Sequence, residues 1–172
     1  MRYYVKWFFV VLLISSLTSF IEKDKPVNGL SVGEYAPDFV MTDALSKDND
    51  PAQKKLSELH GNYVLVNFWA SYDALSRIRN IELSRALEQT DAARRQIEFV
   101  SVSFDDFESI FRETIRRDRI VGTGCFVDTS GSKSEIFKDY ELNKGLTNYL
   151  LDDNGMIIAK NISVAELSAY LN

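Results

Sequence analysis

A continuous apolar run at residues 63–70 (YVLVNFWA) constrains the fold of this chain more than any other feature. The run is short and rich in β-branched and aromatic residues. It also lacks the alternation of apolar and polar positions that marks a strand with one solvated face. It therefore predicts a strand buried on both faces of a sheet. Such a strand needs covering layers on both sides, so the sequence favours an α/β fold.

Helical and strand-like patterns alternate after this strand. Apolar residues at helical spacing predict helices over residues 73–90, 107–117 and 132–140. Short apolar runs predict strands over residues 97–104, 124–128, 148–151 and 156–160. Asn154-Gly155 indicates a hairpin between the last two strands, Ser163 with Glu166 forms a capping box that begins a terminal helix, and residues 42–55 are interpreted as a loop. This order predicts a three-layer sandwich with a mixed sheet flanked by helices.

The same helical spacing predicts which side chains face the core. These are, in chain order, Leu75, Ile78, Ile81, Leu83, Leu87, Phe107, Ile110, Phe111, Ile115, Leu167, Tyr170 and Leu171.

The first twenty residues have the order of a targeting segment. Arg2 and Lys6 precede the apolar run 7–14 (WFFVVLLI), and small polar residues follow it, as in a signal peptide. That run spans about 12 Å as a helix, short of a ~30 Å hydrocarbon core, although a segment extended to residue 21 leaves an uncleaved membrane anchor open. We therefore predict a signal peptide or anchor over residues 1–20, a linker over 21–29 and one domain over 30–172. The protein would be exported to the periplasm or cell envelope.

The chain holds one cysteine, Cys125, and one histidine, His60. Within this chain these counts exclude a disulfide framework, a CxxC redox centre, a cysteine-rich zinc site and an iron–sulfur cluster. The formal net charge of −5 provides no basic field for a phosphate backbone, so nucleic acid is not an expected partner. We expect no cofactor and no metal, and we interpret His60 as a solvent-facing turn residue.

Four stretches, in chain order and at similar spacing, resemble exported thioredoxin-like proteins of the TlpA type, which are also grouped with the AhpC/TSA redoxins. They are residues 32–39 (VGEYAPDF), 56–63 (LSELHGNY), 64–71 (VLVNFWAS), and 149–152 (YLLD) with Gly155. The resemblance covers about residues 30–172. It implies a thioredoxin-like fold and a place in the thiol-disulfide oxidoreductase or peroxiredoxin families.

The departures from that family bear on the chemistry. There, the central strand leads into a WCxxC motif whose first cysteine, at a helix N-terminus, is the attacking thiolate. Here Asp73 matches that cysteine, Ser76 matches the resolving cysteine, and Leu146 replaces the cis-proline that faces the dithiol. A non-proline cis bond costs about 2.5–4 kcal/mol, so we expect a trans peptide at Leu146. We expect no catalytic residue at these positions. Asp73 is interpreted as a helix N-cap, the alternative being a permanent anion presented to a partner.

Without a dithiol, the groove that it faced can still bind an exported protein or peptide. The residues expected to form this surface are Trp69, Tyr72, Asp73, Leu75, Arg77, Gly145, Leu146 and Thr147. Two such functions stay open, a protein- or peptide-binding domain and an assembly subunit whose activity belongs to its partner. The alternative is a weak one-cysteine redoxin acting through Cys125, which is otherwise expected to be a buried core thiol.

Overall fold

The structure is a computed structural model that describes residues 27–42, 45, 53–89, 97–120 and 124–171. The predicted targeting segment and most of the predicted linker lie outside these residues. The strands are β1 (Val40–Thr42), β2 (Gln53–Lys55), β3 (Tyr63–Trp69), β4 (Ile97–Ser103), β5 (Cys125–Val127), β6 (Asn148–Leu151) and β7 (Ile157–Lys160). The helices are α2 (Ala74–Gln89), α4 (Glu108–Asp118), α5 (Glu135–Asp139) and α6 (Val164–Leu171), with 3-10 turns η1 (Leu56–Leu59), η2 (Gly131–Lys133) and η3 (Leu142–Lys144).

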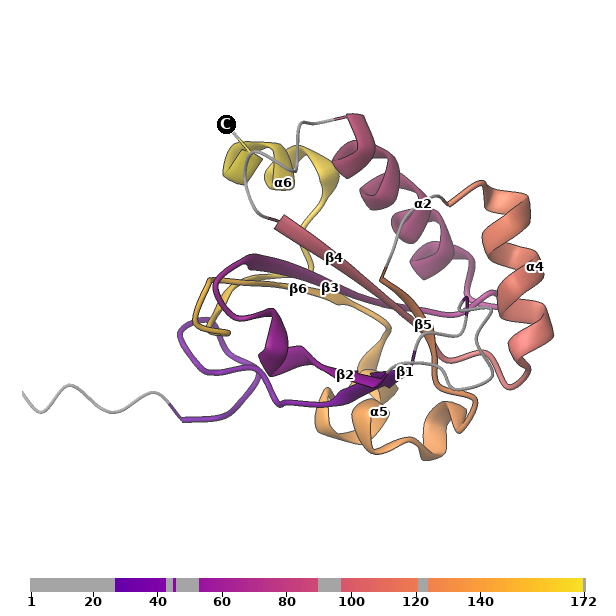
Figure 1. Cartoon of the computed structure of the whole chain (residues 1–172), viewed down its shortest axis with the longest axis horizontal. Coiled ribbons are helices and arrows are strands. Elements are labelled where there is room, and N and C mark those ends of the chain that lie inside the picture. The colour runs from indigo at the N-terminus through magenta and orange to yellow at the C-terminus, as the bar shows by residue number, and fades with distance from the viewer. Residues whose placement is uncertain (1–26, 43–44, 46–52, 90–96, 121–123, 172) are drawn as a thin grey trace, which may run out of the picture.

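Five of the strands form one mixed sheet in the order β5-β4-β3-β6-β7. β3, β4 and β5 run parallel, whereas β6 is antiparallel to β3 and to β7. Helices α2, α4 and α6 cover one face, and α5 with the β1–β2 ribbon covers the other (Figure 1). The predicted three-layer α/β sandwich with a mixed central sheet is therefore confirmed.

The central strand β3 is buried on both faces, as its apolar run predicts. On one face Val66 and Phe68 pack in a cluster with Tyr140, whose ring centroid lies 4.7 Å from that of Phe68. On the other face Leu65 packs with Leu83 of α2. Because both faces of β3 are anchored in this way, the loop that follows β3 has a fixed origin.

Polar side chains set the rotation of α2 about its axis. Asn67 of β3 donates from Nδ2 to Asn80 Oδ1 at 2.9 Å. The Ser101 hydroxyl of β4 donates to the same oxygen at 2.8 Å, and all three residues are fully buried. A buried polar group that loses its partner costs about 1–3 kcal/mol, so these bonds hold Asn80 toward the sheet.

This rotation corrects the predicted inner face of α2. Leu75 and Ile78 were predicted to face the core, but their exposed fractions are 76% and 52%. Ile81 is half-buried. The buried positions of the helix are Ser76, Asn80, Leu83, Ser84 and Leu87. Leu83 and Leu87 are thus confirmed as inner residues, and polar residues share the inner face at positions that the apolar pattern did not include.

The predicted inner faces of the other two long helices need smaller corrections. The inner positions that are confirmed are Phe111, Ile115 and Leu167. Phe107 is exposed because it precedes the first turn of α4. Ile110 lies in that first turn and is also exposed, and Thr114 is buried beside the confirmed pair. Tyr170 is also exposed, and the Leu171 side chain lies outside the described residues.

Two local signals of the sequence are confirmed. Gly155 closes the β6–β7 hairpin with φ of +83°, and the Ser163–Glu166 capping box forms with reciprocal bonds of 2.8 and 3.3 Å.

The interpretation of residues 42–55 as a loop is wrong in part, because β2 pairs with β1. The helix predicted over 132–140 is formed by η2 and α5. No helix among the described residues is long and apolar enough to cross a bilayer.

Replacing Asn80 by alanine should lower the free energy of unfolding by about 2 kcal/mol, because Asn67 Nδ2 and Ser101 Oγ would lose their common acceptor. Urea denaturation of both proteins measures this difference. Glu82→Ala, at an exposed position of the same helix, is the control and should stay within about 0.5 kcal/mol of the parent protein. Equal losses in the two variants would contradict the role given to the amide.

Candidate functional site

The N-terminus of α2 carries a carboxylate cap. Asp73 Oδ1 accepts a hydrogen bond from the backbone N–H of Ser76 at 2.7 Å, which is the predicted N-cap bond. This bond lowers the pKa of Asp73, and a weaker effect comes from the positive charge of Arg79. The site therefore holds a permanent negative charge at the positive end of a helix.

Ser76 closes the same turn from inside the protein. Its hydroxyl accepts from the backbone N–H of Ala70 at 3.3 Å and donates to the carbonyl of Asp73 at 3.2 Å. The residue is 1% exposed, so its hydroxyl does not reach solvent. His60 precedes β3, whose seven residues extend about 20 Å toward the site, so the histidine cannot act as its base.

A second, buried carboxylate holds the loop between β3 and α2 by hydrogen bonds. Asp105 is 2% exposed and accepts three bonds, from Ser71 N at 2.9 Å, Ser71 Oγ at 2.6 Å and Ser103 Oγ at 2.8 Å. Sequence reasoning missed this role. The available signal was an acidic residue directly after a parallel strand that neighbours β3.

Arg77 was predicted to line the binding surface, but its side chain is engaged elsewhere. Its guanidinium forms a two-pronged bond with Asp118 of α4, at 2.7 Å from Nε and 2.6 Å from Nη2. This bond raises the pKa of Arg77. The Asp118 side chain is 7% exposed, so the pair joins α2 to α4 rather than facing a ligand.

The loop of residues 145–147, which was predicted to form part of the binding surface, contacts α2 and β3. Arg79 Nη1 donates to the carbonyl of Leu146 at 3.0 Å, and the backbone N–H of Phe68 donates to the carbonyl of Thr147 at 3.0 Å. The trans peptide expected at Leu146 is confirmed. Sequence reasoning missed Arg79, although its position one helical turn after Leu75 places both on one face of α2.

Three neighbouring side chains expose apolar area at this end of the sheet, and we name them the α2 patch. They are Tyr72, Leu75 and Ile78, with exposed fractions of 71%, 76% and 52%. Partial burial and the charge of nearby Asp106 raise the pKa of Tyr72, so its phenol is neutral. Burial of one such aliphatic side chain contributes about 1.5–3 kcal/mol, which makes the patch suited to contact with another apolar surface.

Two predicted residues lie beneath this surface. Trp69 is fully buried and packs against Phe111 of α4, with ring centroids 6.2 Å apart. Cys125 belongs to the same buried cluster and is 4% exposed, as expected of a core thiol. Trp69 therefore supports the site from inside, and the thiol does not open onto it.

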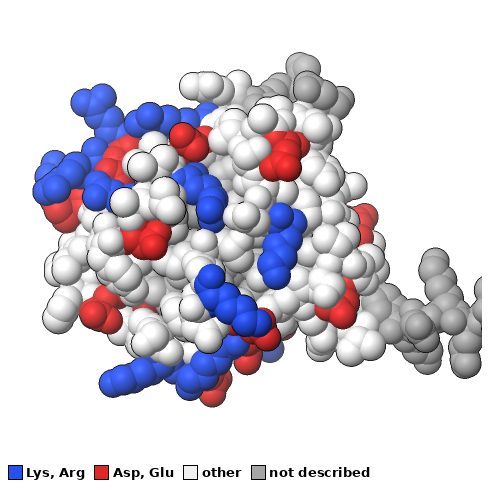
Figure 2. Space-filling view, turned by 180° about the vertical axis from the view of Figure 1, so that it is seen from behind, with Lys and Arg blue, Asp and Glu red and all other residues white. Residues whose placement is uncertain are grey.

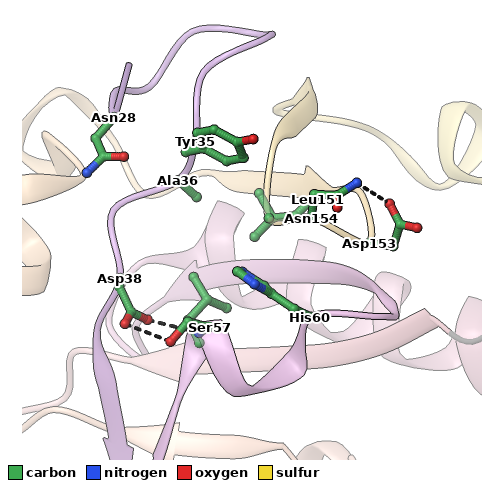
Figure 3. Close-up of a pocket in the computed structure, with 11 residues that line it drawn as sticks. Asn28, Tyr35, Ala36, Asp38, Ser57, His60, Leu151, Asp153 and Asn154 are labelled. Carbon is green, nitrogen blue, oxygen red and sulfur yellow. Dashed lines mark hydrogen bonds between the residues drawn. The ribbon is translucent and has the colours of Figure 1, made fainter. Parts of the chain in front are cut away.

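A separate pocket lies at the opposite end of β3 (Figure 3). It contains Asp38, Ser57, His60 and Asp153, which are the residue types of a hydrolytic site. The Ser57 hydroxyl, however, donates to Asp38 at 2.8 Å rather than to the imidazole, and Asp153 accepts from the Asn154 amide at 2.7 Å. The pocket thus presents no nucleophile paired with a base. His60 is exposed, as predicted.

Comparison with known proteins connects this geometry to one group. The AhpC/TSA family profile matches residues 32–160. A curated relative, the thiol-disulfide oxidoreductase ResA of Oceanobacillus iheyensis, is 24% identical over 166 residues, which cover 95% of this chain and 82% of that protein.

Solved structures agree with that match. A thioredoxin-like protein from Parabacteroides distasonis is 34% identical, with a TM-score of 0.70, 86% of this chain covered and 98% of the other. A thiol-disulfide oxidoreductase from Bacteroides fragilis is 24% identical, with a TM-score of 0.67 and coverage of 80% and 100%, and so shows similarity of fold. The fold is thioredoxin-like, and these relatives are bacterial.

Removal of the Asp73 cap should destabilise the protein in a pH-dependent way. Because the folded pKa of this carboxyl is lowered, its stabilisation is complete above the unfolded pKa and falls as pH drops below about 4. We expect Asp73→Ala to cost about 1 kcal/mol at pH 7 and less at pH 3, measured by urea denaturation at both values. Asp73→Asn keeps a capping oxygen and should cost less at pH 7. A constant difference between the alanine variant and its parent at both pH values would contradict the ionised cap.

Proposed function

The chain belongs to the AhpC/TSA family, and from that premise we propose that it is an exported binding domain that has lost dithiol exchange. The observation that carries the proposal is the α2 N-terminus. The position matched to the attacking cysteine holds the capping carboxylate Asp73, and the position matched to the resolving cysteine holds the buried Ser76. Neither side chain can form a disulfide with a substrate.

The surface around this position suits protein contact. The α2 patch exposes apolar area beside the loop of residues 145–147, where family members place the residues that face their substrate. A partner that covers Leu75 and Ile78 would bury apolar area that stays exposed in the folded chain, and this burial would contribute favourable free energy to binding. We therefore propose that a protein or peptide binds here without a covalent bond. An assembly subunit whose activity belongs to the partner would use the same surface.

Export is part of this proposal. It is supported by the basic start with Arg2 and Lys6, which precedes the apolar run of residues 7–14. The same segment can serve as a tether if it is not cleaved. The one-cysteine redoxin acting through Cys125 gains no support from the thiol's burial, because an attacking thiolate must meet its substrate.

The binding proposal is tested by capture of the partner from the exported fraction of the source cells, with the full-length chain as bait. Leu75→Glu should weaken capture at least about tenfold, because loss of one buried leucine contact costs roughly 1.5–3 kcal/mol. Val32→Glu is the matched control, since Val32 is 64% exposed and lies outside the α2 patch. Dithiothreitol should not release the partner. Release by reductant, or equal capture by Leu75→Glu, would contradict the proposal.

The loss of dithiol exchange is tested by restoring the two thiols. Asp73→Cys/Ser76→Cys should reduce insulin disulfides, because the first thiol then lies at a helix N-terminus, which lowers its pKa. The parent protein and the single Asp73→Cys variant should show no turnover. Turnover in the parent that disappears in Cys125→Ser would establish the one-cysteine redoxin instead. An inactive double variant would remove support for a retained substrate groove.

A further inference from the structure

A cationic groove is lined by the loop of residues 145–147 and by Arg79, which lies one helical turn after Leu75 of the α2 patch. Its volume is about 360 Å³. The residues around it come from α2, η3, the 145–147 loop, β6 and β7, and include Arg79, Lys144, Leu146, Tyr149 and Lys160. We call it the 145–147 groove. Leu146 and Arg79 also belong to the candidate site that contains the α2 patch, so one extended segment can occupy the groove and the patch together.

The charges around the groove are unbalanced. Three cations, Arg79, Lys144 and Lys160, are accompanied by one carboxylate, Glu141. Lys144 Nζ pairs with that carboxylate. Lys160 Nζ lies 5.4 Å above the ring of Tyr149, and burial raises the pKa of Tyr149 to about 12, so the phenol adds no negative charge at neutral pH.

Arg79, like Lys160, pairs with no carboxylate among the described residues. The one hydrogen bond that its guanidinium makes to the described residues goes to the carbonyl of Leu146. Guanidinium groups carry several N–H donors in a planar fork that fits a carboxylate. Arg79 can therefore accept an added anion while it holds the loop in place.

Other basic side chains of the molecule lie in a different setting. On α4 the guanidinium of Arg112 pairs with Glu108, and those of Arg116 and Arg117 pair with Glu113. Figure 2 shows Lys and Arg side chains separated by uncharged surface or mixed with acidic ones, with no continuous basic field on the face in view. The excess of cations around the 145–147 groove therefore contrasts with the net charge of −5 of the whole chain.

We propose that the 145–147 groove binds a carboxylate-bearing segment of the partner protein, with an apolar residue of that segment on Leu75. This inference rests on the proposed binding function and specifies the chemistry of the partner. Leu75 precedes Arg79 by one helical turn, which places their Cβ atoms about 6 Å apart, so an apolar contact and an ionic contact are available to nearby residues of one extended chain. Charge complementarity selects acidic over neutral or basic segments.

The test uses a ten-residue peptide in which two leucines precede four glutamates, and a second peptide with glutamine at the four acidic positions. Binding to the ¹⁵N-labelled full-length chain is followed by NMR titration at 50 mM salt. The glutamate peptide should shift the amide signals of residues 144–147 and 160 and bind about tenfold more tightly than the glutamine peptide. A higher salt concentration should reduce the difference in affinity between the two peptides, because it screens their charges.

Charge-removing variants locate the binding. Lys144→Gln/Lys160→Gln should weaken binding of the glutamate peptide about five- to tenfold, as expected for two partly exposed ion pairs. Lys54→Gln/Lys133→Gln is the matched control, because it removes two exposed cations that lie outside the groove, and it should stay within about twofold. The inference is overturned if the two peptides bind alike, if neither binds at millimolar concentration, or if the shifts fall on α4.

The outcomes separate this inference from the function on which it rests. Suppose that Leu75→Glu abolishes partner capture, but Lys144→Gln/Lys160→Gln captures the partner fully and the two peptides bind alike. The binding function then stands, and the acidic preference is wrong. If Leu75→Glu captures the partner as well as the parent does, the proposed function itself fails.

Discussion

The site depends on one buried contact, in which Asn80 of α2 accepts hydrogen bonds from Asn67 and Ser101 of the sheet. The two bonds satisfy the buried oxygen of Asn80, whereas Asn80 Nδ2 and Asn67 Oδ1 have no hydrogen-bond partner among the described residues. Because loss of these bonds would leave further buried polar groups without partners, the contact fixes the rotation of the helix. With Asn80 directed inward, Leu75 in the preceding turn is exposed and Arg79 reaches the carbonyl of Leu146. A different rotation would bury the leucine and remove the apolar part of the surface.

The predictable parts of the molecule are those whose signals are local. β3 is recognisable because every position of its run except Asn67 is apolar, and the capping box of Ser163 is recognisable because its partner lies three residues away. The rotation of α2 was not predictable in this way. It depends on a contact between Asn67 and Asn80, thirteen positions apart, and the positions of Leu75 and Ile78 suggest a different inner face. The use of Arg77 in a helix–helix bond was hidden for the same reason, since Asp118 is forty-one positions away.

The two ends of β3 have different roles. The described chain begins beside the end where His60 and Asn28 line the polar pocket, and the α2 N-terminus lies at the other end of the strand (Figures 1 and 3). A tether in residues 1–20, as proposed above, would therefore join the domain at the end away from the α2 patch. In this proposed arrangement the apolar side chains of the α2 patch would stay accessible to a partner.

The charges around the site also give a bound segment a direction. Asp73 is a permanent anion at the start of α2, and its lowered pKa keeps it ionised throughout the neutral range. A carboxylate of the proposed partner segment would be repelled by Asp73 and attracted by Arg79 and Lys160 of the 145–147 groove. The apolar contact would supply most of the affinity, and the asymmetric charges would select the register of the segment. On the function proposed above, a fixed carboxylate at the position matched to a reactive thiol would orient a partner where the family forms a transient bond.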